Sequence, residues 1–237
     1  MKGQGLSIYR TTIAGLARLL PQDCFVCGQA SGDRLVCAAC EADLPFLEGP
    51  SCPVCALPAA DGLRCGACQN SPPAFDATSA VFRYAFPVEH IVQGLKYRHR
   101  LPLAGWLAEA LARRLDATGV DCIIPLPLSA QRMKERGFNQ AQELARPLAR
   151  HFGLPLLAEA SLRVADSAPQ ASLPWKERQA NIRQAFECRV DLAGKTIAVV
   201  DDVMTTGATL NEFARTLKLH GAKRVENWVA ARTLPNS

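Results

Sequence analysis

From residue 80 to the C-terminus, short apolar runs alternate with longer segments in which apolar residues recur at helical spacing. Such alternation predicts a mostly parallel sheet with helices on both faces, the α/β class. Sheets of this class bind ligands at the carboxyl ends of their strands. The predicted strands are 81–86, 122–126, 156–164, 196–201 and 225–231, and the predicted helices are 88–96, 103–115, 141–152, 176–184 and 209–220.

The first 75 residues follow a different pattern, which is a repeat of cysteine pairs. Shifting the first four cysteines by 28 residues places each on one of the next four, so each repeat reads CxxC-x9-CxxC. Two thiolates on one CxxC turn reach a single ion, and a second turn completes a tetrahedron. We therefore expect two closed, structural zinc sites. The ligands would be Cys24, Cys27, Cys37, Cys40, Cys52, Cys55, Cys65 and Cys68.

Three alternatives to this interpretation stay open. Iron could occupy a rubredoxin-like site, the CxxC pairs could serve redox chemistry, or the ligands could be paired across the two repeats. Pairing within each repeat is favoured because each repeat carries a full ligand set. A module this small holds few large apolar side chains, so metal binding is expected to supply much of its folding free energy.

The remaining boundaries follow from local composition. Residues 1–20 are expected to form a helix, but Arg10 and Arg18 interrupt its apolar stretch. It therefore lacks the continuous apolar core of a secretory signal and the length of a membrane span, and a cytoplasmic protein without stable membrane insertion is expected. The predicted domains are 21–70, a small cysteine-rich zinc-binding domain, and 79–237, with a proline-containing linker at 71–78.

Charge narrows the ligand only slightly. The formal net charge is +5, and the excess of Lys and Arg lies after Phe75. A basic domain suits an anionic ligand, either a phosphorylated sugar or a nucleic-acid backbone, and does not choose between them.

The most specific motif follows the predicted strand 196–201. Asp201 and Asp202 precede a turn that opens a helix, and these carboxylates can accept hydrogen bonds from ribose hydroxyls. In the turn, Gly207 permits close backbone approach, while N–H groups, hydroxyls and the helix dipole attract a phosphate. No GxxxxGK[ST] motif and no GxGxxG after a strand is present. An ordinary helix cap is the alternative. The turn consists of Thr205, Thr206, Gly207, Ala208 and Thr209.

This segment resembles the ribose-phosphate loop of type I phosphoribosyltransferases: two acidic residues, two further positions, then Thr-Thr-Gly-x-Thr. The whole chain resembles the ComF family, the competence-protein-F and GntX-like group. That wider resemblance is carried by the paired CxxC motifs, by Leu95-Lys96-Tyr97, and by PLPL at 125–128 followed by RGFNQA at 136–141. It implies a type I phosphoribosyltransferase-like fold that binds 5-phosphoribosyl-1-pyrophosphate (PRPP), or a related phosphosugar, with Mg²⁺.

The resemblance also implies two further parts of the site. The segment 129–140 stands where type I enzymes keep a pyrophosphate loop, and 163–186 stands where they keep a mobile hood. An ordinary solvated basic surface is the alternative for both. The candidate phosphate-binding residues are Lys96, Arg132, Lys134, Arg136, Gly137 and Arg163, with Gln170 and Arg178 as further candidates in the hood.

Two functions are compatible with these features. The family is associated with natural transformation, which suggests a PRPP-binding protein that acts in DNA uptake, with single-stranded DNA and DNA-uptake proteins as partners. The basic run 96–100 with Tyr97 suits stacking on single strands, although cations are also common at helix ends. The alternative is an active phosphoribosyltransferase of nucleotide or cofactor metabolism, whose acceptor the sequence does not mark.

Overall fold

The computed structural model describes residues 22–164 and 185–235. The predicted helices 1–20 and 176–184, together with Gln170 and Arg178, lie outside the described residues. Backbone packing divides the chain into two compact units, one ending at Leu44 and one beginning at Pro45. The division falls between the two cysteine repeats. That the linker at 71–78 separates two domains stays a prediction from the sequence.

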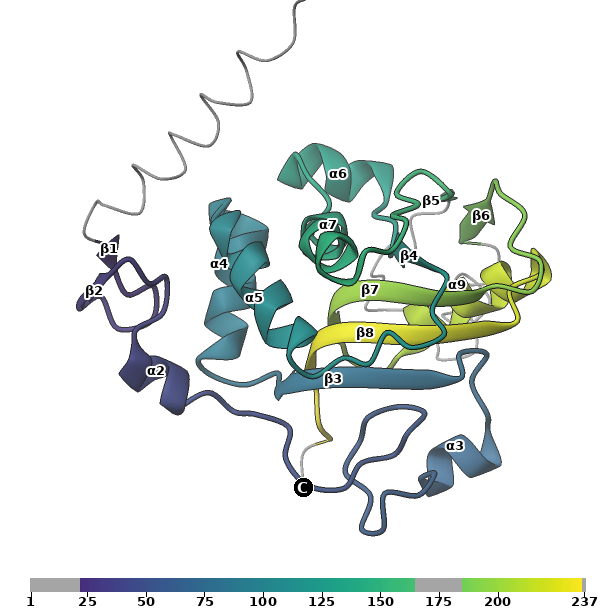
Figure 1. The fold of residues 1–237 in the computed structure, drawn as a ribbon, viewed down its shortest axis with the longest axis horizontal. Coiled ribbons are helices and arrows are strands. Elements are labelled where there is room, and N and C mark those ends of the chain that lie inside the picture. The colour runs from purple at the N-terminus through teal and green to yellow at the C-terminus, as the bar shows by residue number, and fades with distance from the viewer. Residues whose placement is uncertain (1–21, 165–184, 236–237) are drawn as a thin grey trace, which may run out of the picture. The chain divides into compact units, whose positions relative to one another are not determined.

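The first unit contains the first cysteine repeat. Strands β1 (Gln22–Asp23) and β2 (Ala30–Gly32) form a short antiparallel pair, and helix α2 (Ala38–Ala42) follows (Figure 1). The side chain of Cys37 caps α2 by accepting a hydrogen bond from the Cys40 N–H. Helix and strands are this short because the repeat offers few apolar residues to bury.

A four-stranded parallel sheet forms the centre of the second unit. Its order is β3 (Ala77–Arg83), β8 (Arg224–Arg232), β7 (Thr196–Met204), β4 (Cys122–Pro125). Strands β7 and β8 are buried along most of their length, as their continuous apolar runs require in a sheet covered on both sides. The α/β class expected from the sequence is confirmed.

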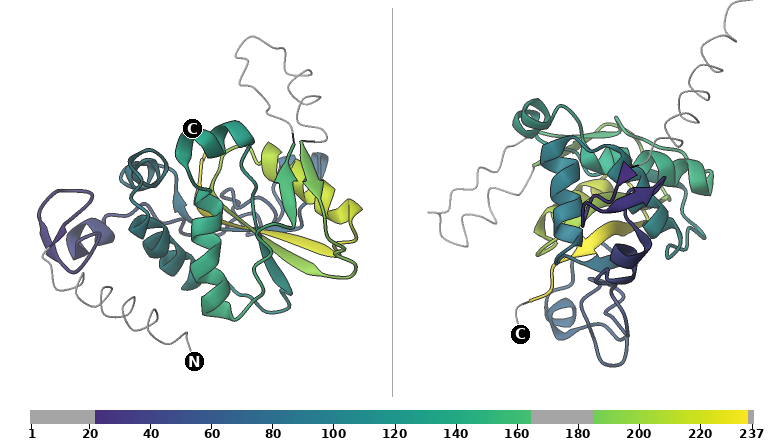
Figure 2. Two further views of the ribbon diagram at one scale, coloured as in Figure 1. Left: turned by 90° about the horizontal axis from the view of Figure 1, so that it is seen from above. Right: turned by 90° about the vertical axis from the view of Figure 1, so that its left-hand side faces the viewer.

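Helices cover both faces of this sheet (Figure 2). On one face lie α4 (Val88–Arg98), α5 (Pro102–Ala112) and α7 (Gln140–Phe152), where Phe152 packs on Trp228 and Trp106 stacks on Phe82. On the other face lies α9 (Ala208–Leu219), whose Phe213 joins a core of alternate strand residues. This alternation follows from the two-residue period of a strand.

The second cysteine repeat is part of this larger unit. Its helix α3 (Gly66–Asn70) follows a loop in which Cys52, Val54 and Cys55 join the same core as Phe213. The Thr78 N–H at the start of β3 also donates to the Pro53 carbonyl, 3.1 Å away. The second repeat therefore shares a core with the sheet.

Three local features differ from the sequence-based expectation. Strand β7 continues to Met204, because β8 extends beside it and pairs with residues 203 and 204. The segment expected to be a loop contains helix α6 (Ala130–Arg136), capped by the Ser129 hydroxyl, which accepts from the Arg132 N–H at 3.3 Å. The strand expected within 156–164 is reduced to β5 (Ser161–Arg163), which pairs antiparallel with β6 (Phe186–Cys188).

No helix in the described ranges is long and apolar enough to cross a bilayer.

Candidate functional site

Two adjacent carboxylates lie near the carboxyl end of the central strand β7. Asp201 and Asp202 are 9% and 2% exposed. Lys96, in the last turn of α4, places its Nζ 2.5 Å from Oδ2 of Asp202. The Asp202 N–H donates to Oδ1 of Asp201 at 2.9 Å. A strand end and a helix end thus bring three charged groups together in a largely buried position.

Electrostatics at this cluster favour one ion pair beside one neutral carboxyl group. Burial, and next the neighbouring Asp202 charge, raise the pKa of Asp201 well above its usual value, and the nearby Lys96 only partly opposes them. For Lys96, burial lowers the pKa, but the attraction and hydrogen bond of Asp202 outweigh it and raise the pKa. The lysine therefore stays charged and pairs with Asp202, while Asp201 is the carboxyl that resists ionisation.

The turn after β7 is shaped to receive an anion. Gly207 caps α9 with φ of 80° and ψ of 1°, in the left-handed region. A Cβ there would lie 2.5 Å from Cε of Met204, the movable end of that side chain, so it is the left-handed backbone conformation that favours glycine. Thr205 and Thr206 are exposed, and the first N–H groups of α9 begin directly after them. The Ala208 N–H donates to the Thr206 hydroxyl at 3.3 Å. The N–H groups of a first helical turn and the helix dipole attract anions.

The carboxylates and the turn, except for Thr206, line one cleft of about 380 Å³. Its wall also carries Lys96, Arg132 and Arg163. Gln140 reaches the cleft as well, and its buried Oε1 has no hydrogen-bond partner among residues 22–164 and 185–235. The cleft thus combines acidic acceptors, N–H donors and cations. The lining residues are Tyr84, Lys96, Leu126, Pro127, Leu128, Arg132, Gln140, Arg163, Asp201, Asp202, Val203, Met204, Thr205, Gly207, Ala208, Thr209 and Leu210.

Not every candidate from the basic segment reaches this cleft. Lys134 is exposed on α6, and Gly137 ends that helix with φ of 72°. Arg136 is buried, with its guanidinium 5.4 Å from the centre of the Tyr97 ring. Neither Lys134, Arg136 nor Gly137 is among the lining residues, whereas Arg132 is. The helical conformation of 130–136 explains this separation, because it turns successive side chains in different directions.

Two polar lining residues lie outside the sequence-based candidates. Tyr84 follows β3 directly, and Gln140 begins α7. Ligands of parallel sheets bind at the carboxyl ends of the strands, and this rule points to Tyr84 as a site residue. The signal for Gln140 was its position in RGFNQA.

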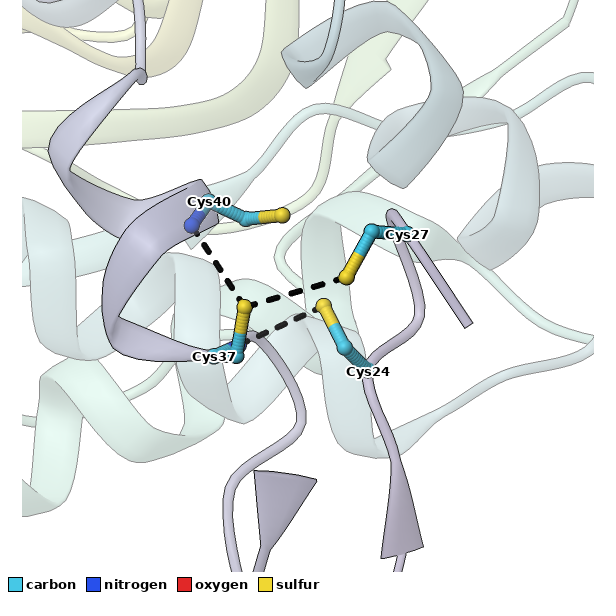
Figure 3. A group of neighbouring side chains, drawn as sticks. All are labelled: Cys24, Cys27, Cys37 and Cys40. Carbon is cyan, nitrogen blue, oxygen red and sulfur yellow. Dashed lines mark hydrogen bonds between the residues drawn. The ribbon is translucent and has the colours of Figure 1, made fainter. Parts of the chain in front are cut away.

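The cysteines gather into two four-thiol groups, one within each repeat. Figure 3 shows the sulfurs of Cys24, Cys27, Cys37 and Cys40 turned toward a common point. All four ligand atoms of each group lie within 4.8 Å of one another, and the Cys27 and Cys37 sulfurs are 3.8 Å apart. Zn–S bonds of about 2.3 Å in a tetrahedron place sulfurs about 3.8 Å apart, so the thiols fit zinc.

The two groups repeat the same local chemistry. The Cys37 N–H donates to the sulfur of Cys24 at 3.3 Å, and the Cys65 N–H donates to the sulfur of Cys52 at the same distance. Burial raises the pKa of these acceptor thiols, but the N–H bonds outweigh it and lower the pKa of Cys24 and of Cys52 to about 6. Each site thus favours a thiolate before metal arrives. The bound ion would act as a cross-link.

Comparison with known proteins agrees with both parts of the chain. A family model described as a double zinc ribbon domain matches residues 15–69, and one described as a phosphoribosyl transferase domain matches residues 134–233. The DNA utilization protein YhgH of Salmonella typhi is 37% identical over 170 residues, which cover 69% of this chain and 75% of that protein. Competence protein F of Haemophilus influenzae is 32% identical over 174 residues, which cover 68% and 74%.

Proposed function

Since the chain belongs to the ComF family, which includes competence protein F and the DNA utilization protein YhgH, we propose that its cleft binds PRPP together with Mg²⁺. One observation carries this proposal: the buried acidic pair and the Gly207 turn line the same cleft. A ribose 5-phosphate group needs both, because its hydroxyls seek acceptors while its phosphate seeks N–H donors.

Each part of the ligand has a partner in the cleft. The 5-phosphate would lie at the Gly207 turn, where the N–H groups of α9 begin. The ribose hydroxyls would donate to Asp201 and Asp202. The diphosphate would lie toward Lys96 and Arg132, where cations line the wall.

The magnesium ion would accompany the diphosphate. Among residues 22–164 and 185–235, both clusters of three or more potential metal ligands consist of cysteines. Mg²⁺ commonly takes substrate phosphates and water as ligands, and when bound it would neutralise part of the diphosphate charge. The protein's own contribution is to position the sugar between the carboxylates and the turn.

We further propose a role in handling internalised DNA in the cytoplasm. The relatives' names, which refer to DNA utilization and competence, and one surface feature support the DNA-handling role. Tyr97 is 66% exposed and is followed by Arg98, His99 and Arg100, all exposed. An exposed aromatic ring among cations suits a single strand, whose bases stack while its phosphates are neutralised. Turnover of PRPP as an active transferase is the alternative, and it requires a nucleophilic acceptor.

Titration calorimetry of Mg²⁺–PRPP into the zinc-loaded protein tests the site. We expect saturable binding that weakens at least tenfold in the double variant Asp201→Asn/Asp202→Asn. Asp116→Asn, an isosteric change at an exposed loop residue, is the matched control and should bind normally. Undiminished binding in the double variant, or no binding in the wild type, would refute the proposal.

Two further titrations separate the roles. Tight, salt-sensitive binding of a single-stranded oligonucleotide in the absence of PRPP binding would assign the protein to nucleic acid and not to PRPP. Release of pyrophosphate on adding candidate amine or base acceptors would establish the transferase alternative.

A further inference from the structure

One guanidinium group joins the second cysteine repeat to the phosphate turn. Arg232, the last residue of β8, is 4% exposed and lies in register with Met204, the last residue of β7. Its Nε donates to the Cys55 carbonyl at 2.9 Å. Its Nη1 donates to the Met204 carbonyl at 3.1 Å and to the Thr205 carbonyl. Arginine suits this role because its donors have fixed relative directions.

Two other contacts follow the same route. The Ala74 N–H donates to Oδ1 of Asn211, in the first turn of α9, at 2.6 Å. Phe75 belongs to the same core as Cys55 and Met204, and its ring would lie 3.7 Å from a Cβ at residue 207. The turn is therefore held against the second repeat and the residues that follow it by hydrogen bonds between side chains and main chain and by apolar packing.

The duplication provides a comparison within the molecule. Cys27 occupies the position in the first repeat that Cys55 occupies in the second, but it belongs to the other compact unit. Cys27 is exposed, whereas Cys55 is buried. The two four-thiol groups thus have the same ligands in different surroundings.

We propose that metal binding at the second four-cysteine site and phosphosugar binding at the Gly207 turn are thermodynamically linked, with Arg232 as the positioning residue between them. This inference rests on the proposed PRPP site. A metal that closes the second site fixes the Cys55 main chain, which fixes the Arg232 guanidinium. The guanidinium in turn holds the Met204 and Thr205 carbonyls, so that the following N–H groups face the cleft. Linkage is reciprocal, so the sugar phosphate must also tighten metal binding.

A pair of equivalent cysteine variants tests the coupling in the full-length chain. Cys65→Ser and Cys37→Ser remove corresponding ligands, and each should lower the zinc content from two ions to one. Hydrogen exchange then reports on the turn without any ligand. We expect faster exchange of amides 205–211 in Cys65→Ser, unchanged exchange there in Cys37→Ser, and unchanged exchange of helix α7 in both.

Ligand binding gives the second measurement. The affinity for Mg²⁺–PRPP should fall in Cys65→Ser by about 5- to 150-fold, the usual range for coupled sites, and stay unchanged in Cys37→Ser. In the reciprocal direction, cobalt replaces zinc. Added PRPP should shift the cobalt–thiolate absorption of Cys37→Ser, where cobalt occupies the second site, and leave that of Cys65→Ser unchanged.

Arg232→Lys tests the connecting residue. This variant should keep two zinc ions and its helical circular dichroism, yet show faster exchange at 205–211 and weaker PRPP binding, since lysine lacks the fork that joins the Cys55 carbonyl to those of Met204 and Thr205. If Cys65→Ser fails to fold, this variant carries the test alone.

The outcomes separate the two proposals. Equal effects of the two cysteine variants on the turn, or normal exchange in Arg232→Lys, would overturn the coupling. If hydrogen exchange at the turn depends on metal but the protein does not bind PRPP, the structural connection between metal site and turn stands, and the proposal that the turn binds PRPP is refuted.

Discussion

Replacing either carboxylate of the acidic pair by its amide should weaken ligand binding, but the two changes should alter stability in opposite directions. The raised pKa of Asp201 means that burial and the Asp202 charge disfavour its ionisation more than Lys96 favours it. Asp201→Asn removes that charge, and its amide oxygen can still accept the bond from the Asp202 N–H. Asp202→Asn instead takes away the ion-pair partner of Lys96, whose side chain is 16% exposed.

The magnitudes follow from these environments. Relief of one disfavoured charge should raise the free energy of unfolding by about 1 kcal/mol, within the range of stabilising single changes. Breaking a fully buried ion pair costs about 3–5 kcal/mol, and partial exposure of Lys96 reduces this to about 2 kcal/mol. For a unit of this size, 1 kcal/mol corresponds to about 2–4 °C in Tm. We expect Asp201→Asn to melt about 2–4 °C higher than the wild type, and Asp202→Asn about 4–8 °C lower.

Thermal unfolding by circular dichroism at several pH values measures both effects. A raised pKa in the folded state means that protonation of Asp201 stabilises the wild type below that pKa, and that this stability is lost as pH rises through it. The advantage of Asp201→Asn should therefore be complete above the raised pKa and shrink as pH falls toward 3.8, the ordinary value. The wild type and both variants must carry equal amounts of zinc, because metal loss at low pH would add its own effect.

A lower melting temperature for Asp201→Asn, or a gap to the wild type that does not change with pH, would refute this account. Stronger PRPP binding by Asp201→Asn would contradict the proposed role of the carboxylates. The combination expected here is a more stable protein with a weaker site.

Three other changes give separate tests. Gly207→Ala should lower the free energy of unfolding by about 1–2 kcal/mol, because its φ is left-handed, and should weaken PRPP binding at least tenfold. The control is Gly153→Ala, at a φ of 66° with no atom within 4 Å of the added Cβ, which should lower stability similarly without affecting PRPP binding. Thermal melting and calorimetry compare the two variants. Tyr97→Ala should weaken oligonucleotide binding by about 1–3 kcal/mol in a fluorescence titration and leave PRPP binding unchanged. Asp76→Ala should lower the free energy of unfolding by about 1–3 kcal/mol, measured by chemical denaturation. It removes the carboxylate that accepts hydrogen bonds from Lys218 Nζ at 2.9 Å and from the Val225 N–H at 2.8 Å.

The sequence predicted the parallel sheet because its strand and helix periods are strong and alternate along the chain. It also located the acidic pair and the Gly207 turn, since both are contiguous in sequence and need no knowledge of distant contacts. It did not locate the end of β7, because the added residues depend on pairing with β8. The pairing partner lies about 28 residues further along the chain, so local pattern does not report it.

The conformation of residues 130–136 could have been read from local propensity. Glutamine, arginine, methionine, lysine and glutamate all favour helices, and Ser129 is a good cap. The resemblance to a pyrophosphate loop favours charged side chains, so it predicts Lys134 and Arg136 and passes over Gln140. The ion pair of Lys96 with Asp202 joins residues more than 100 positions apart, and only the fold brings them together.

The sharing of a core between the second cysteine repeat and the sheet has a consequence for how the two copies of the duplication tolerate change. Substitutions around Cys52 and Cys55 must preserve metal binding, packing of the hydrophobic core and the geometry of the ligand site at the same time. The corresponding positions around Cys24 and Cys27 lie outside that core. In a saturation library selected for PRPP binding, we expect the first repeat to accept many residue types between its ligands and the second to accept few, so that one copy is free to acquire a new partner while the other is held by the site.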